Sequence, residues 1–166
     1  MNRISGKDLW KLIFLVSVVV LLQVNILPRL WPFEVYPDFI FILVIILAFD
    51  LDYRRSFLPI FACGLLKDIF GAHLFGFHTA VFTLEAGLIY LFSRYLSKEL
   101  PGLKFIAVIV FTLFNYMLIS LLLRRPYIFI SLIEIFLNCL FLIPVLKFYR
   151  SLDIFTAKQK FRIGTF

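Results

Sequence analysis

Six apolar runs, separated by short segments rich in charge, Pro or Gly, occupy most of the 166 residues of this chain. They lie at about residues 9–27, 39–49, 57–70, 75–92, 103–123 and 127–146. A helix that crosses a bilayer needs about 20 mostly apolar residues. Hydrophobic residues make up 63% of the chain and charged residues 16%, which excludes an ordinary soluble domain. The pattern predicts an all-α, polytopic membrane protein with about six transmembrane helices.

The predicted spans at residues 39–49 and 57–70 are short for a full crossing. Either they use flanking polar residues near the interface, or they form a tighter, partly re-entrant hairpin. The domain organisation that we expect is one six-helix transmembrane domain over residues 1–150, followed by a basic tail over residues 151–166.

The placement of Lys and Arg predicts the orientation in the membrane, because cytoplasmic loops collect these residues. If the N-terminus is cytoplasmic, thirteen of them lie inside and three outside, and both termini are cytoplasmic. This topology explains the net charge of +7 without nucleic acid as a partner. Cations alternate with aromatic residues in the tail, which could bind anionic lipid at the membrane surface. An ordinary positive-inside tail is the simpler interpretation.

Polar side chains inside the apolar runs are the best indicators of a functional site, because they are costly in hydrocarbon. The candidates form an intramembrane polar cluster of Lys67, Asp68, His78, Glu85, Glu134 and Asn138. Helical spacing places Ser131, Glu134 and Asn138 on one face of their span. The polar side chains of the different spans could converge on a central cavity in which Glu85 or Glu134 is the counter-ion of Lys67. Alternatively, they form buried hydrogen bonds that specify helix packing, or a docking surface for another membrane protein.

Small residues predict where helices approach each other closely. The candidate helix-packing positions are Gly64, Gly71, Thr79, Thr83 and Gly87.

Motifs for common chemistries are missing from the sequence: there is no H-E-x-x-H, no G-x-x-x-x-G-K-[ST], no C-x-x-C and no G-x-S-x-G. The two histidines, His73 and His78, are five residues apart, which is the wrong spacing for a metal pair on a helix. We therefore expect no catalytic residue, no metal site and no cofactor.

Two sequence elements carry a family resemblance: Pro37-Asp38 at the opening of the second run, and CGLLKDIFGAHLFGFHTAVFTL at residues 63–84. In the second element, Gly64, Asp68 and Gly76 are the family-typical positions. The sequence resembles MreD, the small integral membrane protein of the bacterial rod-shape system. Chain length, number of spans, cytoplasmic termini and the basic tail are similar along the whole chain.

The resemblance implies a non-catalytic scaffold or regulator of cell-wall elongation in the bacterial cytoplasmic (inner) membrane. Its implied partners are the transmembrane helix of MreC and, directly or indirectly, RodA with a class B penicillin-binding protein; a second copy of the chain is a further candidate. The family is similar in size and span count to the S components of energy-coupling-factor transporters. A small-molecule or lipid-binding membrane module of that kind is therefore the alternative function.

Overall fold

The computed structural model describes residues 6–30, 35–70, 75–93, 101–124 and 128–152. All regular secondary structure in these ranges is helical. The first rod is continuous and consists of α1 (Gly6–Leu21), the π-helical turn η1 (Leu22–Ile26) and α2 (Leu27–Leu30). Five further helices follow: α3 (Phe39–Asp50), α4 (Tyr53–Phe70), α5 (Phe77–Ser93), α6 (Pro101–Leu123) and α7 (Ile128–Ser151). The predicted all-helical class, with six rods in the expected order, is confirmed.

Three of these rods are long and apolar enough to cross a membrane: Trp10–Arg29, Gly102–Leu122 and Phe129–Ser151. Two shorter apolar helices, Phe39–Asp50 and Phe77–Phe92, lie between them in the sequence. The helix predicted as the third span, α4, is one continuous helix of 18 residues. It carries Arg54, Arg55, Lys67 and Asp68, which lower its hydropathy.

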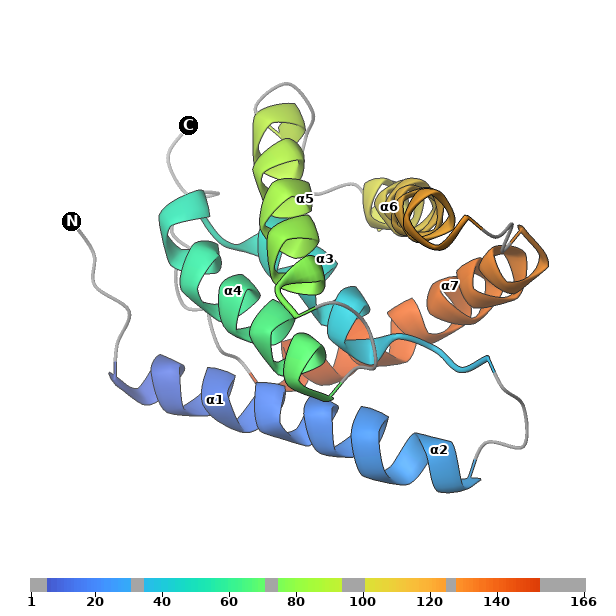
Figure 1. The fold of residues 1–166 in the computed structure, drawn as a ribbon. Coiled ribbons are helices and arrows are strands. Elements are labelled where there is room, and N and C mark those ends of the chain that lie inside the picture. The colour runs from blue at the N-terminus through green and yellow to red at the C-terminus, as the bar shows by residue number, and fades with distance from the viewer. Residues whose placement is uncertain (1–5, 31–34, 71–74, 94–100, 125–127, 153–166) are drawn as a thin grey trace.

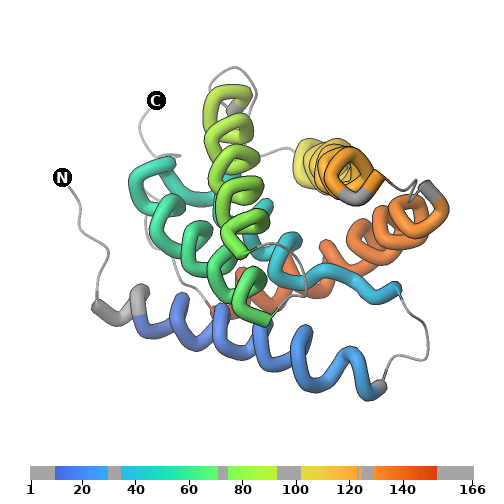
Figure 2. Tube along the Cα trace, in the orientation of Figure 1, coloured from blue at the N-terminus to red at the C-terminus, as the bar shows by residue number. Residues whose placement is uncertain are grey.

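Helix α3 forms the centre of the fold, and the other rods surround it (Figure 1). It contacts α1, α4, α5, α6 and α7. Helices α4 and α5 pair on one side, α6 and α7 pair on the other, and the first rod runs along the bottom of the view (Figure 2). Residues 40–49 of α3 are all buried, as expected for a helix that is hydrophobic on every face. Helix α3 is thus the core of the protein.

The first rod widens into a π-helical turn directly before Pro28. In this turn the Leu27 N–H donates to the Leu22 carbonyl, a bond that spans five residues instead of four. In a regular helix the Pro28 ring would collide with the carbonyl of Val24, and the wider turn relieves this collision. The turn contains Gln23, whose buried side chain points into the bundle.

The outer faces of α6 and α7 are broad and apolar. In the most hydrophobic stretch of each of these two helices, only 22% is buried inside the protein. The exposed side chains include Ile106, Ile109, Val110, Leu113, Met117 and Leu121 on α6, and Phe129, Leu132, Ile133, Phe136, Leu140 and Ile143 on α7. Such continuous apolar faces suit contact with lipid chains or with another membrane helix.

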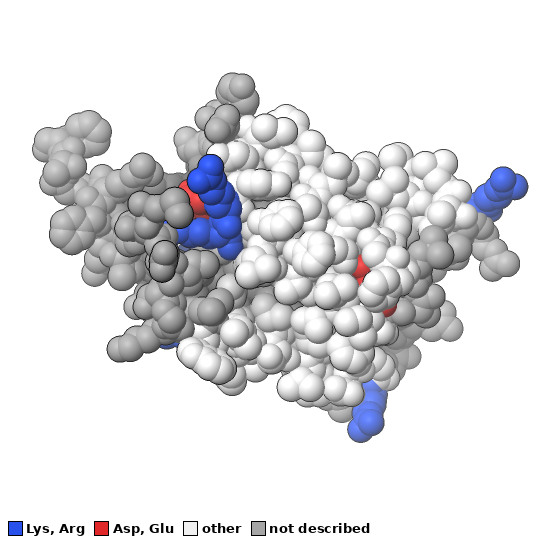
Figure 3. All heavy atoms as spheres, turned by 60° about the vertical axis from the view of Figure 1, so that its left-hand side comes forward, with Lys and Arg blue, Asp and Glu red and all other residues white. Residues whose placement is uncertain are grey.

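Apart from Lys67 in the interior, the described cations divide between the two ends of the bundle. Consecutive rods alternate in direction, and Lys104 at the start of α6 donates to Asp50 at the end of α3 over 2.5 Å. The described cations at this end are Lys11, Arg54, Arg55, Lys104, Lys147 and Arg150, whereas Arg29 and Arg124 lie at the opposite end. A broad, mostly uncharged surface, on which only small areas of Asp or Glu are visible, separates the Lys and Arg groups at its margins (Figure 3).

Candidate functional site

The chain enters α3 inside the bundle, and side chains from distant rods bind the exposed backbone there. The Asp38 carboxylate caps the helix by accepting from the Phe41 N–H over 3.0 Å. Gln23 donates to the same carboxylate over 2.9 Å, and its carbonyl oxygen accepts from the Ile40 N–H over 2.8 Å. The Asn138 carbonyl oxygen accepts from the Asp38 N–H over 2.7 Å. A helix can begin at this depth because its first backbone donors have partners.

Lys67 of α4 binds the same carboxylate and makes an ion pair with Asp38. Its ammonium also lies 5.2 Å from the centre of the Phe82 ring, within the range of a cation–π contact. The counter-ion expected from the sequence was Glu85 or Glu134. That expectation was wrong, because α3 begins beside Lys67 and presents a closer carboxylate.

Asp68 joins α4 to the first turn of α5. Its Oδ1 accepts from the His78 N–H over 2.8 Å and lies 3.0 Å from His78 Nδ1. Its Oδ2 accepts from the Thr79 N–H over 3.0 Å and from the Thr79 hydroxyl over 2.6 Å. A carboxylate in this position satisfies helix N-terminal donors and interacts favourably with the helix dipole. Asp68 therefore caps a helix that follows its own helix in the chain.

Two glycines make this junction possible. A Cβ atom on Gly64 would lie 2.5 Å from the Thr79 Cα and 2.9 Å from its nitrogen, so only glycine permits the observed approach of α4 and α5. Gly76, just before α5, has a φ of +90°, a conformation that side chains disfavour. Gly64, Asp68 and Gly76 thus act on one junction between two helices.

Thr83 and Gly87, two other predicted packing positions, have different surroundings. The Thr83 hydroxyl donates to the Thr79 carbonyl over 2.7 Å, within its own helix. A Cβ atom on Gly87 would meet nothing within 4 Å, so Gly87 does not mark a close helix contact. Gly71 lies outside the described residues, as does His73.

A second polar group lies between α5 and α6. Glu85 is completely buried, and its Oε1 accepts from the Asn115 amide over 2.9 Å. The other carboxylate oxygen of Glu85 has no hydrogen-bond partner among the described residues, and neither do the Thr112 hydroxyl and the Asn115 carbonyl oxygen. Thr112 and Asn115 are one turn apart and share a face of α6.

The third polar group lies between α6 and α7. The Tyr116 hydroxyl donates to the Glu134 carboxylate. Ser131 and Asn138, which share the predicted stripe with Glu134, are both buried. The stripe therefore faces the interior, and its three members lie on the side of α7 that meets α3 and α6.

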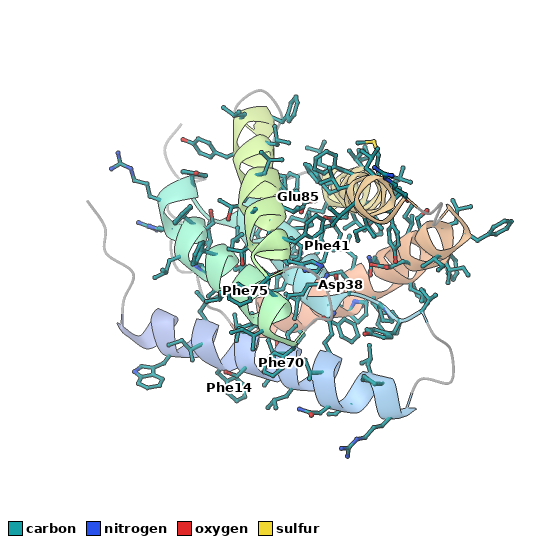
Figure 4. All side chains as sticks on the ribbon, viewed as in Figure 1. Phe14, Asp38, Phe41, Phe70, Phe75 and Glu85 are labelled. Carbon is teal, nitrogen blue, oxygen red and sulfur yellow. The ribbon has the colours of Figure 1, made fainter. Side chains whose placement is uncertain are left out.

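The hydrogen bonds of the predicted polar cluster fall into three groups. Asp68 and His78 form the α4–α5 junction, and Lys67 and Asn138 meet at Asp38. Glu85 and Glu134 bind the adjacent α6 residues Asn115 and Tyr116, within electrostatic reach of Lys67. Asp38 and Glu85 both lie in the interior between the helices (Figure 4). Sequence reasoning missed Gln23 and Tyr116; the available signal for Gln23 was an amide side chain inside an apolar run, which Asn25 shares.

Among the described residues, no three His, Cys, Asp or Glu side chains are placed to hold a metal ion together. Comparison of the chain with models of known protein families, with curated proteins and with solved structures finds no match.

Proposed function

We propose that this chain is a non-catalytic membrane protein of the MreD type, which supports or regulates rod-shape wall elongation by binding the transmembrane helix of MreC. The main support is the position of the residues that carry the resemblance. Asp38 organises the start of α3, and Gly64, Asp68 and Gly76 organise the α4–α5 junction. These residues build the bundle, as a scaffold requires.

Both motif carboxylates are engaged in bonds within the protein. Asp38 binds Lys67 and Gln23, and Asp68 binds His78 and Thr79. A general base must instead be within reach of a substrate proton. This supports a structural role for the motif over a catalytic one.

In this proposal all six rods lie in the bacterial cytoplasmic membrane, with both termini in the cytoplasm. The end that carries Lys11, Arg54, Arg55, Lys104, Lys147 and Arg150 faces the cytoplasm, following the positive-inside rule. Helix α3 is about 18 Å long at 1.5 Å per residue, which is shorter than the hydrocarbon layer. Because neighbouring helices enclose it, it does not need to reach both surfaces.

The partner helix would pack on the exposed apolar faces of α6 and α7. Lipid tails provide no hydrophobic drive between helices, so the association depends on van der Waals packing. RodA and the class B penicillin-binding protein would join the assembly directly or through MreC.

The experiment is a pull-down of the tagged protein, solubilised in mild detergent from its native cells, followed by mass spectrometry of co-purifying proteins and small molecules. Leu113→Trp tests the α6 face, and Leu58→Trp on α4 is the matched control, since both leucines are exposed. We expect a single-span MreC-like protein in stoichiometric amount with the wild type and Leu58→Trp, and at least a several-fold lower recovery with Leu113→Trp.

Recovery of the wild type without any MreC-like protein would contradict the proposal. If a bound small molecule then co-purifies, the alternative function as a ligand-binding membrane module is favoured.

A further inference from the structure

Three oxygen atoms that lack hydrogen-bond partners among the described residues lie on α5 and α6, the two helices that the bond between Glu85 and Asn115 joins. They are Oε2 of Glu85, Oγ1 of Thr112 and Oδ1 of Asn115. Glu85 and Thr112 are 0% and 2% exposed, so water does not replace the missing partners from the surface. Buried polar atoms without partners are rare in proteins, and each one requires an explanation.

The orientation of these oxygens is fixed by the bond between Glu85 and Asn115. The Asn115 amide nitrogen donates to Oε1 of Glu85 over 2.9 Å. Its carbonyl oxygen is therefore close to the same carboxylate but cannot bond to it, because both atoms are acceptors. Thr112, one turn earlier on the same face of α6, adds a third oxygen to this side of the helix.

A positive ligand is compatible with the neighbouring charges once the Glu85 carboxyl has released its proton. Lys67 is within electrostatic reach of Glu85 and Glu134, but its ammonium is engaged by Asp38. Asp38 and Lys67 compensate each other, which leaves Glu85 and Glu134 as acids without a bonded cation among the described residues. Glu134 accepts from the Tyr116 hydroxyl, whereas Glu85 accepts only from a neutral amide and keeps one oxygen free.

We propose that Glu85, Thr112 and Asn115 bind a monovalent metal cation of the Na⁺ type between α5 and α6. Hard cations take carboxylate, carbonyl and hydroxyl oxygens as ligands. A single carboxylate with two neutral oxygens matches a charge of +1, whereas a divalent ion would call for further acids.

The direct test is equilibrium binding of radioactive ²²Na⁺ to the purified full chain in lipid nanodiscs, with choline as the inert replacement cation. We expect saturable binding to the wild type, competed by unlabelled Na⁺. Glu85→Gln removes the charge and keeps an acceptor for Asn115, and Thr112→Val removes the hydroxyl at nearly constant volume. We expect each variant to bind Na⁺ at least tenfold more weakly.

Thr83→Val is the matched control, because the Thr83 hydroxyl is already bonded within its own helix. It should bind Na⁺ like the wild type. Size-exclusion chromatography shows whether each variant is folded and monodisperse; if Glu85→Gln fails to fold, Thr112→Val decides. Thermal unfolding gives a second readout, since a ligand that binds only the folded state raises Tm with its concentration.

The absence of saturable Na⁺ or K⁺ binding to the wild type would overturn the inference, and so would equal affinity in the wild type and Thr112→Val. Stronger competition by K⁺ than by Na⁺ would support the site and assign it the larger ion. The result is independent of the pull-down, because cation binding is measured on the isolated chain without MreC.

Discussion

Asp38 and Lys67, which are 29 residues apart in the sequence, form an ion pair where α3 begins inside the bundle. Gln23 and Asn138 bind the same turn, so the first rod, α4 and α7 all meet at the start of α3. This relationship explains how a short apolar helix is fixed at the centre of the protein. It also leads to the first prediction.

Replacing Lys67 alone should lower the stability of the protein more than replacing Asp38 and Lys67 together. Lys67→Met leaves a buried carboxylate without its cation, a change that typically destabilises a protein by about 3–5 kcal/mol. The double variant Asp38→Asn/Lys67→Met keeps an oxygen that can accept from the Phe41 N–H and has no unpaired charge. We expect its Tm in detergent to be higher than that of Lys67→Met. If the decrease in Tm of the double variant equals the sum of the decreases for Asp38→Asn and Lys67→Met, the two side chains are not coupled.

Removal of the Asp68 carboxylate should destabilise the α4–α5 junction. In Asp68→Ala the two backbone donors at His78 and Thr79 lose their buried partner, with an expected loss of about 2–4 kcal/mol. Asp52→Ala, at an exposed position before α4, serves as the control and should change Tm little. Similar unfolding temperatures for both variants would argue against the cap.

Two glycines on neighbouring helices should respond to alanine in opposite directions. Gly64→Ala places a methyl group against the Thr79 backbone, which cannot move aside as a side chain could, and we expect a loss of about 2 kcal/mol or more. Gly87→Ala meets open space and should stabilise α5 by about 0.5–1 kcal/mol through helix propensity. Thermal unfolding of both variants under the same conditions compares them. A destabilised Gly87→Ala would show that a partner covers this face.

The proposed orientation predicts opposite labelling of the two ends. Single cysteines replace Arg54 or Arg150 at the basic end, or Arg29 or Arg124 at the other end, in a chain whose Cys63 and Cys139 are changed to Ala. A membrane-impermeant thiol reagent applied to intact spheroplasts should label the cysteines at 29 and 124 and leave those at 54 and 150 unlabelled until the membrane is opened. The reverse pattern would invert the topology.

The helices could be predicted from the sequence because hydropathy and length determine them locally. Every predicted run corresponds to a helical rod, and the largest shifts in the ends are a few residues. The polar stripe of Ser131, Glu134 and Asn138 was also predictable, since helical spacing alone places these residues on one face.

The partners of the polar groups could not be predicted in the same way. Lys67 has Asp68 beside it in the sequence, yet the helix directs Asp68 towards α5 and Lys67 towards the start of α3. The bond between Asp38 and Asn138 spans 100 residues, so it depends on how α3 and α7 pack. Similarly, Gly87 has the residue type of a packing position, but the structure places no atom against it.

The bond from the Asp38 backbone to Asn138 also has a consequence for biosynthesis. A ribosome that inserts this chain from its N-terminus delivers Gln23, Asp38 and Lys67 well before Asn138. At about 5–20 residues per second, several seconds separate α3 from the residue that completes its first turn. During this interval the nascent α3 can pack against the first rod, α4, α5 and α6 but not against α7, and its first turn is completed only when the last helix enters the bilayer.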